Sequence, residues 1–357
     1  MPSKRNVLSV VLIVLGLLSA VFVTVLTNPD VTVPGLSVGY DLTIHDEYAF
    51  VSNNDGVAVI DISSHNYPIR VNQIPVSDGV FGLEIVDDTL YAGADSQGLV
   101  IVDISTPSNP AILETHSFVS GIQNLYVTGD RAYVVKLSGI LQIIDVTNSS
   151  NPSELASLDV GSYSLDVFVN GDIAYVADSN DGLVVVDVSD PTTPDIIRTV
   201  SFATGAWDIS VHEDTLYLAS HSMGVRIFDI SSPENPAYRS SYNDVGEVYG
   251  VFGNGECLAL ADLQEGAKLL NVTDPGNPTL IAEYENAAPH DVYFDGVYTY
   301  LADQDREFIL IDFQDFGTYA YAVTTPSHLW LWAFPFSLLS IGALIVIPSL
   351  LKRKTNE

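Results

Sequence analysis

The stretch Gly98 to Pro110, GLVIVDISTPSNP, decides the fold of this chain. An apolar run typical of a β-strand leads to Asp103, and a polar turn that contains two prolines follows. Close copies of this stretch begin at Gly56, Gly182 and Gly224, and weaker copies begin at Ile140, Gly266 and Glu307. The aspartate position therefore recurs at Asp61, Asp103, Asp145, Asp187, Asp229, Asn271 and Asp312, with a spacing of 42 residues that shortens to 41 at the last step.

This period predicts the architecture. Self-similarity every 40 to 45 residues or so is typical of four-stranded propeller blades, which bury their faces only by stacking in a ring. In the first unit we expect strands at Asp41 to His45, Glu47 to Ser52, Val57 to Ile62 and Ile69 to Pro75. We therefore predict an all-β fold, a seven-bladed β-propeller of four-stranded blades with repeats of about 42 residues. Counts of six or eight blades stay open.

The repeated residues have structural explanations. The aspartate is followed two residues later by Ser or Thr, as in Asp103 and Ser105, a pattern that caps a turn through side-chain to backbone hydrogen bonds. The glycine before the third strand, such as Gly98, supplies a positive φ without steric cost. The third strand is apolar almost throughout, so we expect neighbouring blades to cover both of its faces. A role repeated in every copy is structural rather than catalytic.

The motif resembles the LVIVD repeat, found in bacterial and archaeal cell-surface proteins and associated with β-propellers. The resemblance covers about Asp41 to Phe313 and is weakest in the copies at Asn271 and Asp312. Asn271 replaces the aspartate in one copy and Glu307 replaces the glycine in another. The G-H and W-D signatures of WD40 blades are absent from the sequence. The resemblance implies a propeller at the cell surface, and it implies no catalytic residues.

The last blade needs a fourth strand, and two segments compete for this place. Val31 to Val33 could supply it from the N-terminal side. Thr318 to Val323, TYAYAV, could supply it from the C-terminal side and stands at the repeat position that the other blades use. We therefore expect the C-terminal segment to complete the ring.

The composition limits the partners. The chain has 45 acidic and 13 basic residues, a formal net charge of −32. A surface this acidic repels nucleic acid, because binding it requires cations that neutralise phosphates. The acidity has two explanations: solubility in a saline exterior, or carboxylate sites for a divalent cation such as Ca²⁺, the only cofactor we consider. The single Cys257 excludes an intrachain disulfide and a thiolate metal cluster.

Both ends carry long apolar stretches. Val7 to Leu26 follows two basic residues and predicts a signal peptide or an uncleaved signal-anchor helix. Leu329 to Leu351 contains no charge, begins with two tryptophans and is followed directly by three basic residues, which predicts a transmembrane helix. The predicted domains are a signal or anchor segment over 1–27, an extracellular propeller over 28–326, a transmembrane helix over 327–351 and a basic cytoplasmic tail over 352–357.

Basic clusters at both termini place both on the cytoplasmic side of the cell membrane if the N-terminal helix is not cleaved. The propeller between them then lies outside the cell. Asn148-Ser149-Ser150 and Asn271-Val272-Thr273 fit the glycosylation acceptor pattern, so Asn148 and Asn271 are candidate sites on such an exterior domain.

Candidate ligand-binding residues lie where the repeats differ. The first strand of each propeller blade lines the central channel, so equivalent positions form a ring. The ring position is occupied by Asp41, Gly82, Asn124, Asp166, Asp208, Gly250 and Asp291. The residues directly before them are Tyr40, Phe81, Gln123, Leu165, Trp207, Tyr249 and His290. Carboxylates, an amide and aromatic platforms at one channel mouth predict a ligand site formed by Asp41, Asn124, Asp166, Asp208, Asp291, Tyr40, Trp207, Tyr249 and His290.

The sequence favours binding over catalysis. It contains no GxSxG, HExxH, P-loop or dinucleotide motif, and its seven histidines have no pair at metal-ligand spacing, so no catalytic or metal-binding residue is assigned. We predict a membrane-anchored extracellular module for a protein or glycan partner. The alternatives are a surface hydrolase or lyase that uses the channel-mouth carboxylates, and a structural component of a surface layer.

Overall fold

The structure is a computed structural model that describes residues 9–11, 22–24, 30–32, 38–117, 121–243 and 246–313, with side chains from residue 38 onward. The chain divides into two units, Asp30–Phe313 and a second unit that combines Met1–Pro29 with Gln314–Glu357. In the second unit the described residues form two short antiparallel strands, β1 (Ser9–Val11) and β2 (Phe22–Thr24).

These six residues lie within Val7 to Leu26, where the sequence predicts a helix. The structure gives them as strands, so the helix is not confirmed at these positions. Their Val, Phe and Thr residues have high strand propensity. The rest of that stretch and all of Leu329 to Leu351 lie outside the described residues. Among the residues that the structure does describe, no helix is long and apolar enough to cross a membrane.

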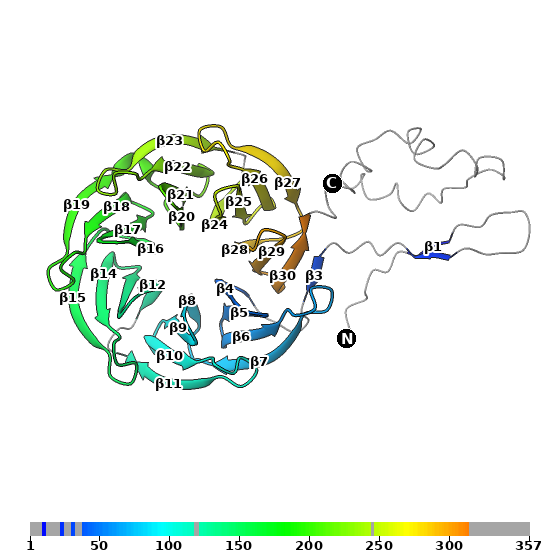
Figure 1. The fold of residues 1–357 in the computed structure, drawn as a ribbon, viewed down its shortest axis with the longest axis horizontal. Helices are drawn as coiled ribbons and strands as arrows, with labels where there is room; N and C mark the ends of the chain where they lie inside the picture. Colours follow the sequence, from blue (N-terminus) through cyan, green and yellow to red (C-terminus); the bar gives the residue numbers. More distant parts are fainter. Residues whose placement is uncertain are drawn as a thin grey trace, which may run out of the picture. The chain divides into compact units, whose positions relative to one another are not determined.

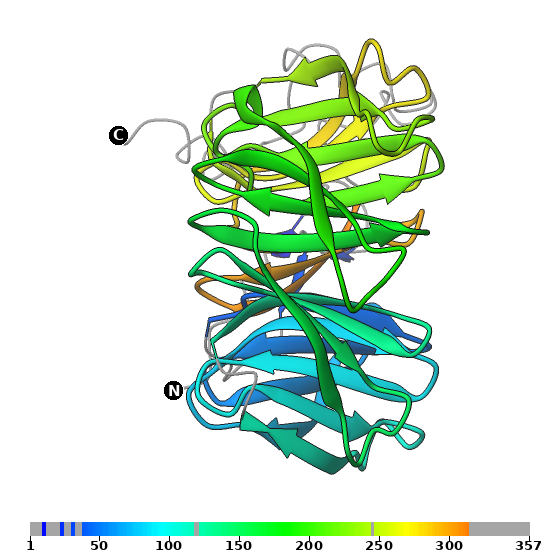
Figure 2. The ribbon, with the colours of Figure 1, turned by 90° about the vertical axis from the view of Figure 1, so that its left-hand side faces the viewer.

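Seven four-stranded antiparallel sheets form a closed ring, which confirms the predicted seven-bladed propeller (Figure 1). In each blade the first strand lies innermost and the fourth outermost. Blade 1 consists of β4 (Leu42–His45), β5 (Tyr48–Asn53), β6 (Gly56–Asp61) and β7 (Ile69–Pro75), close to the predicted bounds. Seen from the edge, the outer strands β15 (Ser153–Asp159) and β19 (Asp195–Val200) run obliquely across the rim (Figure 2).

The remaining blades repeat this order. Blade 2 contains β8 (Val80–Val86), β9 (Thr89–Ala94), β10 (Leu99–Asp103) and β11 (Ala111–His116). Blade 3 contains β12 (Ile122–Thr128), β13 (Arg131–Lys136), β14 (Ile140–Asp145) and β15. Blade 4 contains β16 (Ser164–Asn170), β17 (Ile173–Asp178), β18 (Gly182–Asp187) and β19, which a short 3₁₀ helix, η2 (Ser201–Ala203), follows.

Blade 5 contains β20 (Ile209–His212), β21 (Thr215–Ala219), β22 (Val225–Asp229) and β23 (Ala237–Tyr242). Blade 6 contains β24 (Val248–Gly253), β25 (Cys257–Asp262), β26 (Gly266–Asn271) and β27 (Thr279–Tyr284). Blade 7 contains β28 (Pro289–Phe294), β29 (Tyr298–Asp303), β30 (Glu307–Asp312) and β3 (Asp30–Thr32).

The fourth strand of blade 7 therefore comes from the N-terminal side, and the expectation that Thr318 to Val323 fills this place is wrong. β3 pairs antiparallel with β30, with Val31 opposite Leu310. The seventh repeat explains the difference, because Asp312 is followed by FQDFG in place of the capped, proline-containing turn that leads to the fourth strand elsewhere. Thr318 to Val323 lies outside the described residues.

The hydrophobic core lies between neighbouring blades rather than at the centre of the ring. One cluster joins blades 1 and 2 through residues such as Val59 and Val100, and another joins blades 7 and 1 through Leu310 and Ile60. The third strands β6, β10 and β18 are buried at every position except the final aspartate, as predicted. Each blade thus depends on its neighbours for the burial of both faces.

The predicted turn caps are confirmed. In blades 1 to 5, Oδ1 of the repeated aspartate accepts a hydrogen bond from the backbone N–H two residues later, at 2.9 Å for Asp103 and Ser105. The same bond occurs at Asp61, Asp145, Asp187 and Asp229, and at Asn271 with the amide oxygen as acceptor. The hydroxyl of Ser105, followed by its backbone N–H, holds the pKa of the Asp103 carboxyl below its usual value through hydrogen bonds. The aspartate of the motif is therefore part of the scaffold.

Candidate functional site

At the N-terminal end of each first strand, two residues lie opposite a single residue of the second strand, and this β-bulge or equivalent pairing shapes the channel mouth. In β8 the register passes from Val80 opposite Ala94 to Gly82 opposite Gly93, so Phe81 is the extra, unpaired residue. The equivalent extra residues are Gln123, Leu165, Tyr249 and His290. In blades 1 and 5, one residue of the second strand likewise faces Tyr40-Asp41 and Trp207-Asp208. A bulge changes the direction of a side chain, so both the ring residue and the residue before it can lie at the channel mouth.

The ring carboxylates link neighbouring blades. Oδ2 of Asp41 in blade 1 accepts a hydrogen bond from the N–H of Leu83 in blade 2, at 2.6 Å. Asp291 closes the ring in the same way, because its Oδ2 accepts from the N–H of Leu42 at 3.1 Å. The same bond joins Asp166 to Ile209 at 2.8 Å and Asp208 to Val251 at 2.6 Å. The structure thus brings the predicted ring residues together and gives four of them a structural role.

The other ring positions have different chemistry. Asn124 donates from Nδ2 to Oδ1 of Asp166 at 2.8 Å, so it belongs to the same network. A Cβ on Gly82 would lie 2.7 Å from Cα of Asn124, and a Cβ on Gly250 would lie 2.8 Å from Cα of Asp291. Glycine at these two positions therefore permits the close approach of neighbouring first strands.

The four carboxyls interact as two pairs, Asp41 with Asp291 and Asp166 with Asp208. Desolvation raises the pKa of Asp41 to about 7. Burial, followed by the charge of a neighbouring carboxylate, raises the pKa values of Asp166 and Asp291 well above the usual value. Because the negative charge of one carboxylate opposes ionisation of its partner, the ring loses its protons at a higher pH than exposed aspartates do.

We expect the propeller to lose stability as the pH rises through about 7. A carboxyl whose pKa is higher in the folded than in the unfolded state makes the folded state bind more protons, so its contribution is present in mild acid and is lost as the pH passes the raised pKa of Asp41, about 7. The measurement is the melting temperature between pH 5 and 9 at constant ionic strength. The double variant Asp166→Asn with Asp291→Asn removes the two most strongly shifted acids and should flatten the profile. A melting temperature of the unmodified chain that is constant or rises across this range would contradict the prediction.

Aromatic side chains continue around the mouth above five successive blades. We call Phe81, Tyr40, His290, Tyr249 and Trp207 the aromatic crescent. Neighbouring ring centroids are 5.2 Å apart for Phe81 and Tyr40, 5.7 Å for Tyr40 and His290, 5.9 Å for His290 and Tyr249, and 4.2 Å for Tyr249 and Trp207. All five side chains are half-buried, so each retains an exposed surface at the channel mouth.

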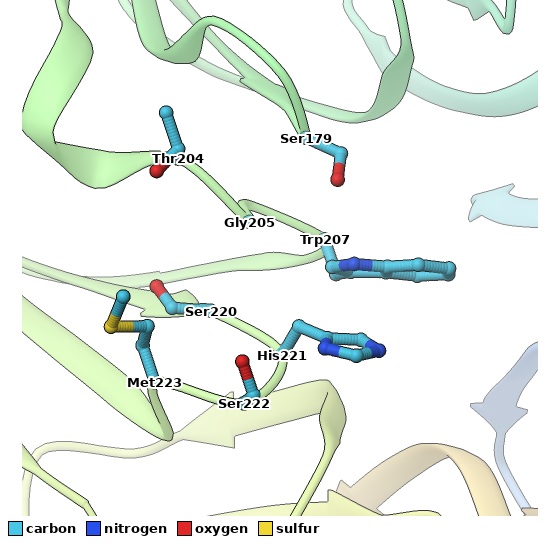
Figure 3. Close-up of a pocket in the computed structure, with 8 residues that line it drawn as sticks. All are labelled: Ser179, Thr204, Gly205, Trp207, Ser220, His221, Ser222 and Met223. Carbon is cyan, nitrogen blue, oxygen red and sulfur yellow. The ribbon is translucent and has the colours of Figure 1, made fainter.

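A hollow of about 310 Å³ adjoins the Trp207 end of the crescent (Figure 3). Its lining residues come from the loops of blades 4 and 5 and are Ser179, Thr204, Gly205, Trp207, Ser220, His221, Ser222 and Met223. The rings of Trp207 and His221 are stacked with centroids 5.6 Å apart, and His221 also contacts Tyr249 at 5.4 Å. The hollow therefore extends the aromatic surface outward from the channel.

His221 is the functional candidate that the sequence reasoning missed. It lies in the turn between β21 and β22, and its Nε2 is 3.7 Å from Oε1 of Glu247. The turn Ser220 to Gly224 has the same length as Asp178 to Gly182 in blade 4, so its length gave no signal in the sequence. His221 adopts a positive φ of 48°, an uncommon conformation outside glycine.

The loop Asp178 to Gly182, whose sequence resembles part of a calcium-binding loop, is a hairpin turn. Asp178 is fully buried, and its carboxylate accepts bonds from the N–H groups of Ser162, Tyr163, Asn180 and Asp181 and from Oγ of Ser164. Asp262 and Asp303 occupy the same position in blades 6 and 7 and bond turn N–H groups in the same way. Across the described ranges, no group of three or more His, Cys, Asp or Glu side chains is arranged to hold a metal ion.

The two glycosylation candidates, Asn148 and Asn271, are exposed at the turns that lead to the fourth strands. Oδ1 of Asn271 accepts bonds from the N–H and Oγ1 of Thr273. The modification of either residue remains a prediction.

Comparison with solved structures supports the fold alone. The β-propeller domain of Swd1 from Myceliophteria thermophila is similar with a TM-score of 0.63 at 13% identity, over 78% of this chain and 96% of that one. The RRP9 WD40 repeats give a TM-score of 0.64 at 12% identity over 79% and 97%, and the computationally designed Ika8 protein gives 0.58 at 12% over 77% and 83%. A comparison with curated protein sequences gives no match.

The fold and the mouth define a repeat β-propeller with a polar channel ring and an aromatic rim. A model of the LVIVD repeat matches residues 39–74, 81–116, 122–160, 161–201, 203–244 and 289–315, more than half of the chain. The chain therefore belongs to the LVIVD repeat family. Blade 6, which carries Asn271 at the aspartate position, lies outside the matched ranges, although the structure gives it four strands like the others.

Proposed function

We propose that this propeller is a membrane-anchored extracellular binding module whose aromatic crescent recognises a protein or glycan partner. The observation that carries the proposal is the continuous chain of five half-buried rings around one channel mouth, next to a hollow of about 310 Å³. Aromatic side chains combine a large apolar surface with few rotatable bonds, and they dominate binding surfaces for that reason. The repeated motif supplies only the scaffold that holds them.

The anchoring part of the proposal rests on the sequence. Leu329 to Leu351 is long enough to span a bilayer and is followed by Lys352, Arg353 and Lys354. Val7 to Leu26 would serve as a signal peptide or as a second anchor. An epitope tag inserted at Gly129, where no atom lies within 4 Å of a built Cβ, tests the orientation. Antibody labelling of intact cells supports an extracellular propeller, and labelling only after permeabilisation overturns it.

Removing aromatic surface from the crescent should abolish partner binding. The full chain in detergent would be applied to glycan and peptide arrays, and the double variant Trp207→Ala with Tyr249→Ala should lose at least tenfold in affinity for its best ligand, because central aromatics often contribute about 2 kcal/mol or more. The matched control is Tyr67→Ala, since Tyr67 is 63% exposed in the turn between β6 and β7. Equal binding by both variants would contradict the proposal.

A second candidate, a hydrolase or lyase, is favoured by the raised pKa values of the paired ring carboxyls, since shifted acids are typical of catalytic sites. The engagement of Oδ2 of Asp166 and Asp208 by backbone N–H groups favours the structural role instead. Turnover of an array ligand that is lost in Asp208→Asn, with the fold retained, would support the enzyme.

A further inference from the structure

We propose that the ligand of the aromatic crescent is an organic cation, the basic side chain of a polypeptide partner, held between the aromatic rings and the negative charge of the carboxyl ring beneath them. This inference rests on the proposed binding function and specifies its ligand. Each crescent residue is directly followed in the chain by a ring residue, and in all five blades the pair lies at a bulge or at a two-to-one pairing with the second strand.

The first argument concerns charge. The charges that act on Asp41 are those of Asp208 and Asp166, and the charges that act on Asp291 are those of Asp41 and Asp208. The ring acids thus experience one another as like charges across the channel. A cation at the mouth would relieve this repulsion, whereas an anion would add to it. The net charge of −32 attracts cations to the whole molecule as well.

The second argument concerns the aromatic faces. A cation within about 6 Å of a ring centroid is attracted by the ring quadrupole, and Trp is the strongest partner, followed by Tyr and Phe. The crescent provides one residue of each type, Trp207, Tyr249 and Phe81, together with Tyr40 and His290. An arginine guanidinium or a lysine ammonium with its methylene stem can contact these rings while it faces the carboxyl ring.

The third argument separates a cation from a neutral sugar. Sugar recognition uses carboxylate oxygens as hydrogen-bond acceptors for hydroxyl groups. Here Oδ2 of Asp41, Asp208 and Asp291 already accepts a backbone N–H from the next blade. The negative charge of these groups still attracts a cation, but their oxygens have fewer free acceptor positions for sugar hydroxyl groups. The observations therefore favour a ligand that responds to charge.

The hollow at Trp207 suits the rest of a peptide. Ser179 and Ser222 offer hydroxyl groups, and Met223 is 50% exposed and offers a flexible apolar contact. A basic side chain at the crescent would allow the neighbouring residue of the same peptide to enter this hollow.

Cation binding should be linked to proton release. The deprotonated ring attracts the cation more strongly than the protonated ring does, so binding lowers the pKa values of the carboxyl pairs, and affinity rises as the pH increases through about 7, the raised value for Asp41. The groups that face Asp41 are Asp291, Asp208 and Asp166, with Tyr40 and His290 on the mouth side. This pH dependence distinguishes binding at the crescent from binding to the acidic surface, because exposed carboxylates are already ionised at pH 6.

The test is isothermal titration of the full chain with acetylated, amidated pentapeptides in which Arg, Lys, citrulline or Glu stands between glycines. The Arg and Lys peptides should bind at least tenfold more tightly than the citrulline peptide. Their affinity should also be about threefold higher at pH 8 than at pH 6. Asp208→Asn should weaken Arg binding and reduce the pH dependence, Trp207→Phe should weaken it less than Trp207→Ala, and Tyr67→Ala should leave it unchanged. Melting curves confirm that each variant is folded.

The outcomes separate the two proposals. Equal binding of the Arg and citrulline peptides, or tight binding of a neutral glycan at the crescent with no binding of basic peptides, overturns the cation inference while the binding function stands. If Trp207→Ala and Tyr249→Ala leave the binding of the Arg peptide unchanged, the peptide binds the general acidic surface and the inference is overturned. Array binding that is independent of the crescent overturns the proposed function as well.

Discussion

Replacing Gly98 by alanine is expected to lower the free energy of unfolding by about 3 to 5 kcal/mol, the range of severe single substitutions. Gly98 directly precedes the third strand of blade 2 and has a φ of 76°, which costs an L residue about 1 to 2 kcal/mol. In addition, a Cβ would lie 2.3 Å from the carbonyl oxygen of His116 in the fourth strand, so the two strands would have to separate. The measurement is urea unfolding followed by tryptophan fluorescence.

The control isolates the steric part of this effect. Gly129 has a φ of 58°, and no atom lies within 4 Å of its built Cβ. Gly129→Ala therefore introduces the backbone strain without the clash and should cost about 1 to 2 kcal/mol. Similar losses in the two variants would show that the close approach of the fourth strand does not explain the glycine of the repeat.

The seventh repeat provides a natural exception. Glu307 occupies the glycine position with a φ of 62°. In blade 1 the fourth strand reaches this position, where Pro75 lies opposite Gly56, and in blade 7 the described part of β3 extends to Thr32 opposite Ile309. Glu307 also accepts a hydrogen bond at Oε1 from Nδ2 of the buried Asn53. A side chain is therefore accommodated at the glycine position of blade 7.

The fold could be predicted from the sequence because its determinants are local and repeated. The pattern of Gly98, the apolar run and Asp103 specifies one strand, one positive φ and one capped turn, and it recurs at a constant spacing. Each repeat is a unit that buries its faces only against its neighbours, so the period alone indicates a ring. The channel positions followed from the same alignment of repeats, which is why Asp41, Asp166, Asp208 and Asp291 could be named.

What those carboxyls do could not be predicted, because it depends on contacts between blades. The bond from the N–H of Leu83 to Asp41 joins residues 42 positions apart, and that from Leu42 to Asp291 joins residues 249 apart. The bulges that bring Phe81 and Tyr249 to the rim arise from strand register, which residue types specify only weakly. His221 was missed because it lies in a turn outside the ring positions and because its contact with Tyr249 crosses from blade 5 to blade 6.

The closure of the ring was mispredicted although a signal existed. Preference for Thr318 to Val323 relied on its position in the repeat. The turn before it lacks the Ser or Thr cap and the prolines that precede every other fourth strand, and this loss indicates that the seventh repeat does not continue into one. The absence of the turn was therefore more informative than the spacing.

Replacing Asp30–Thr32 by Gly-Pro-Gly is expected to open the ring and to lower the free energy of unfolding by about 2 to 4 kcal/mol. Glycine and proline disfavour a strand, so the antiparallel pairing with Ile309, Leu310 and Ile311 is lost at constant chain length. These three residues are buried in blade 7, and each lost backbone hydrogen bond contributes roughly 1 kcal/mol. Hydrogen exchange should accelerate first in β30 and then in the contacts between blades 7 and 1.

The matched variant makes the same kind of replacement in Thr318 to Val323. If the N-terminal strand closes the propeller, this second variant keeps the stability and the slow exchange of β30, because β3 still occupies its edge. The reverse pattern, with loss only in the C-terminal variant, would show that the TYAYAV segment closes the ring in solution. Because closure by β3 bonds one end of the propeller chain to the other, every blade should lose protection in the first variant, and those next to the gap should lose the most.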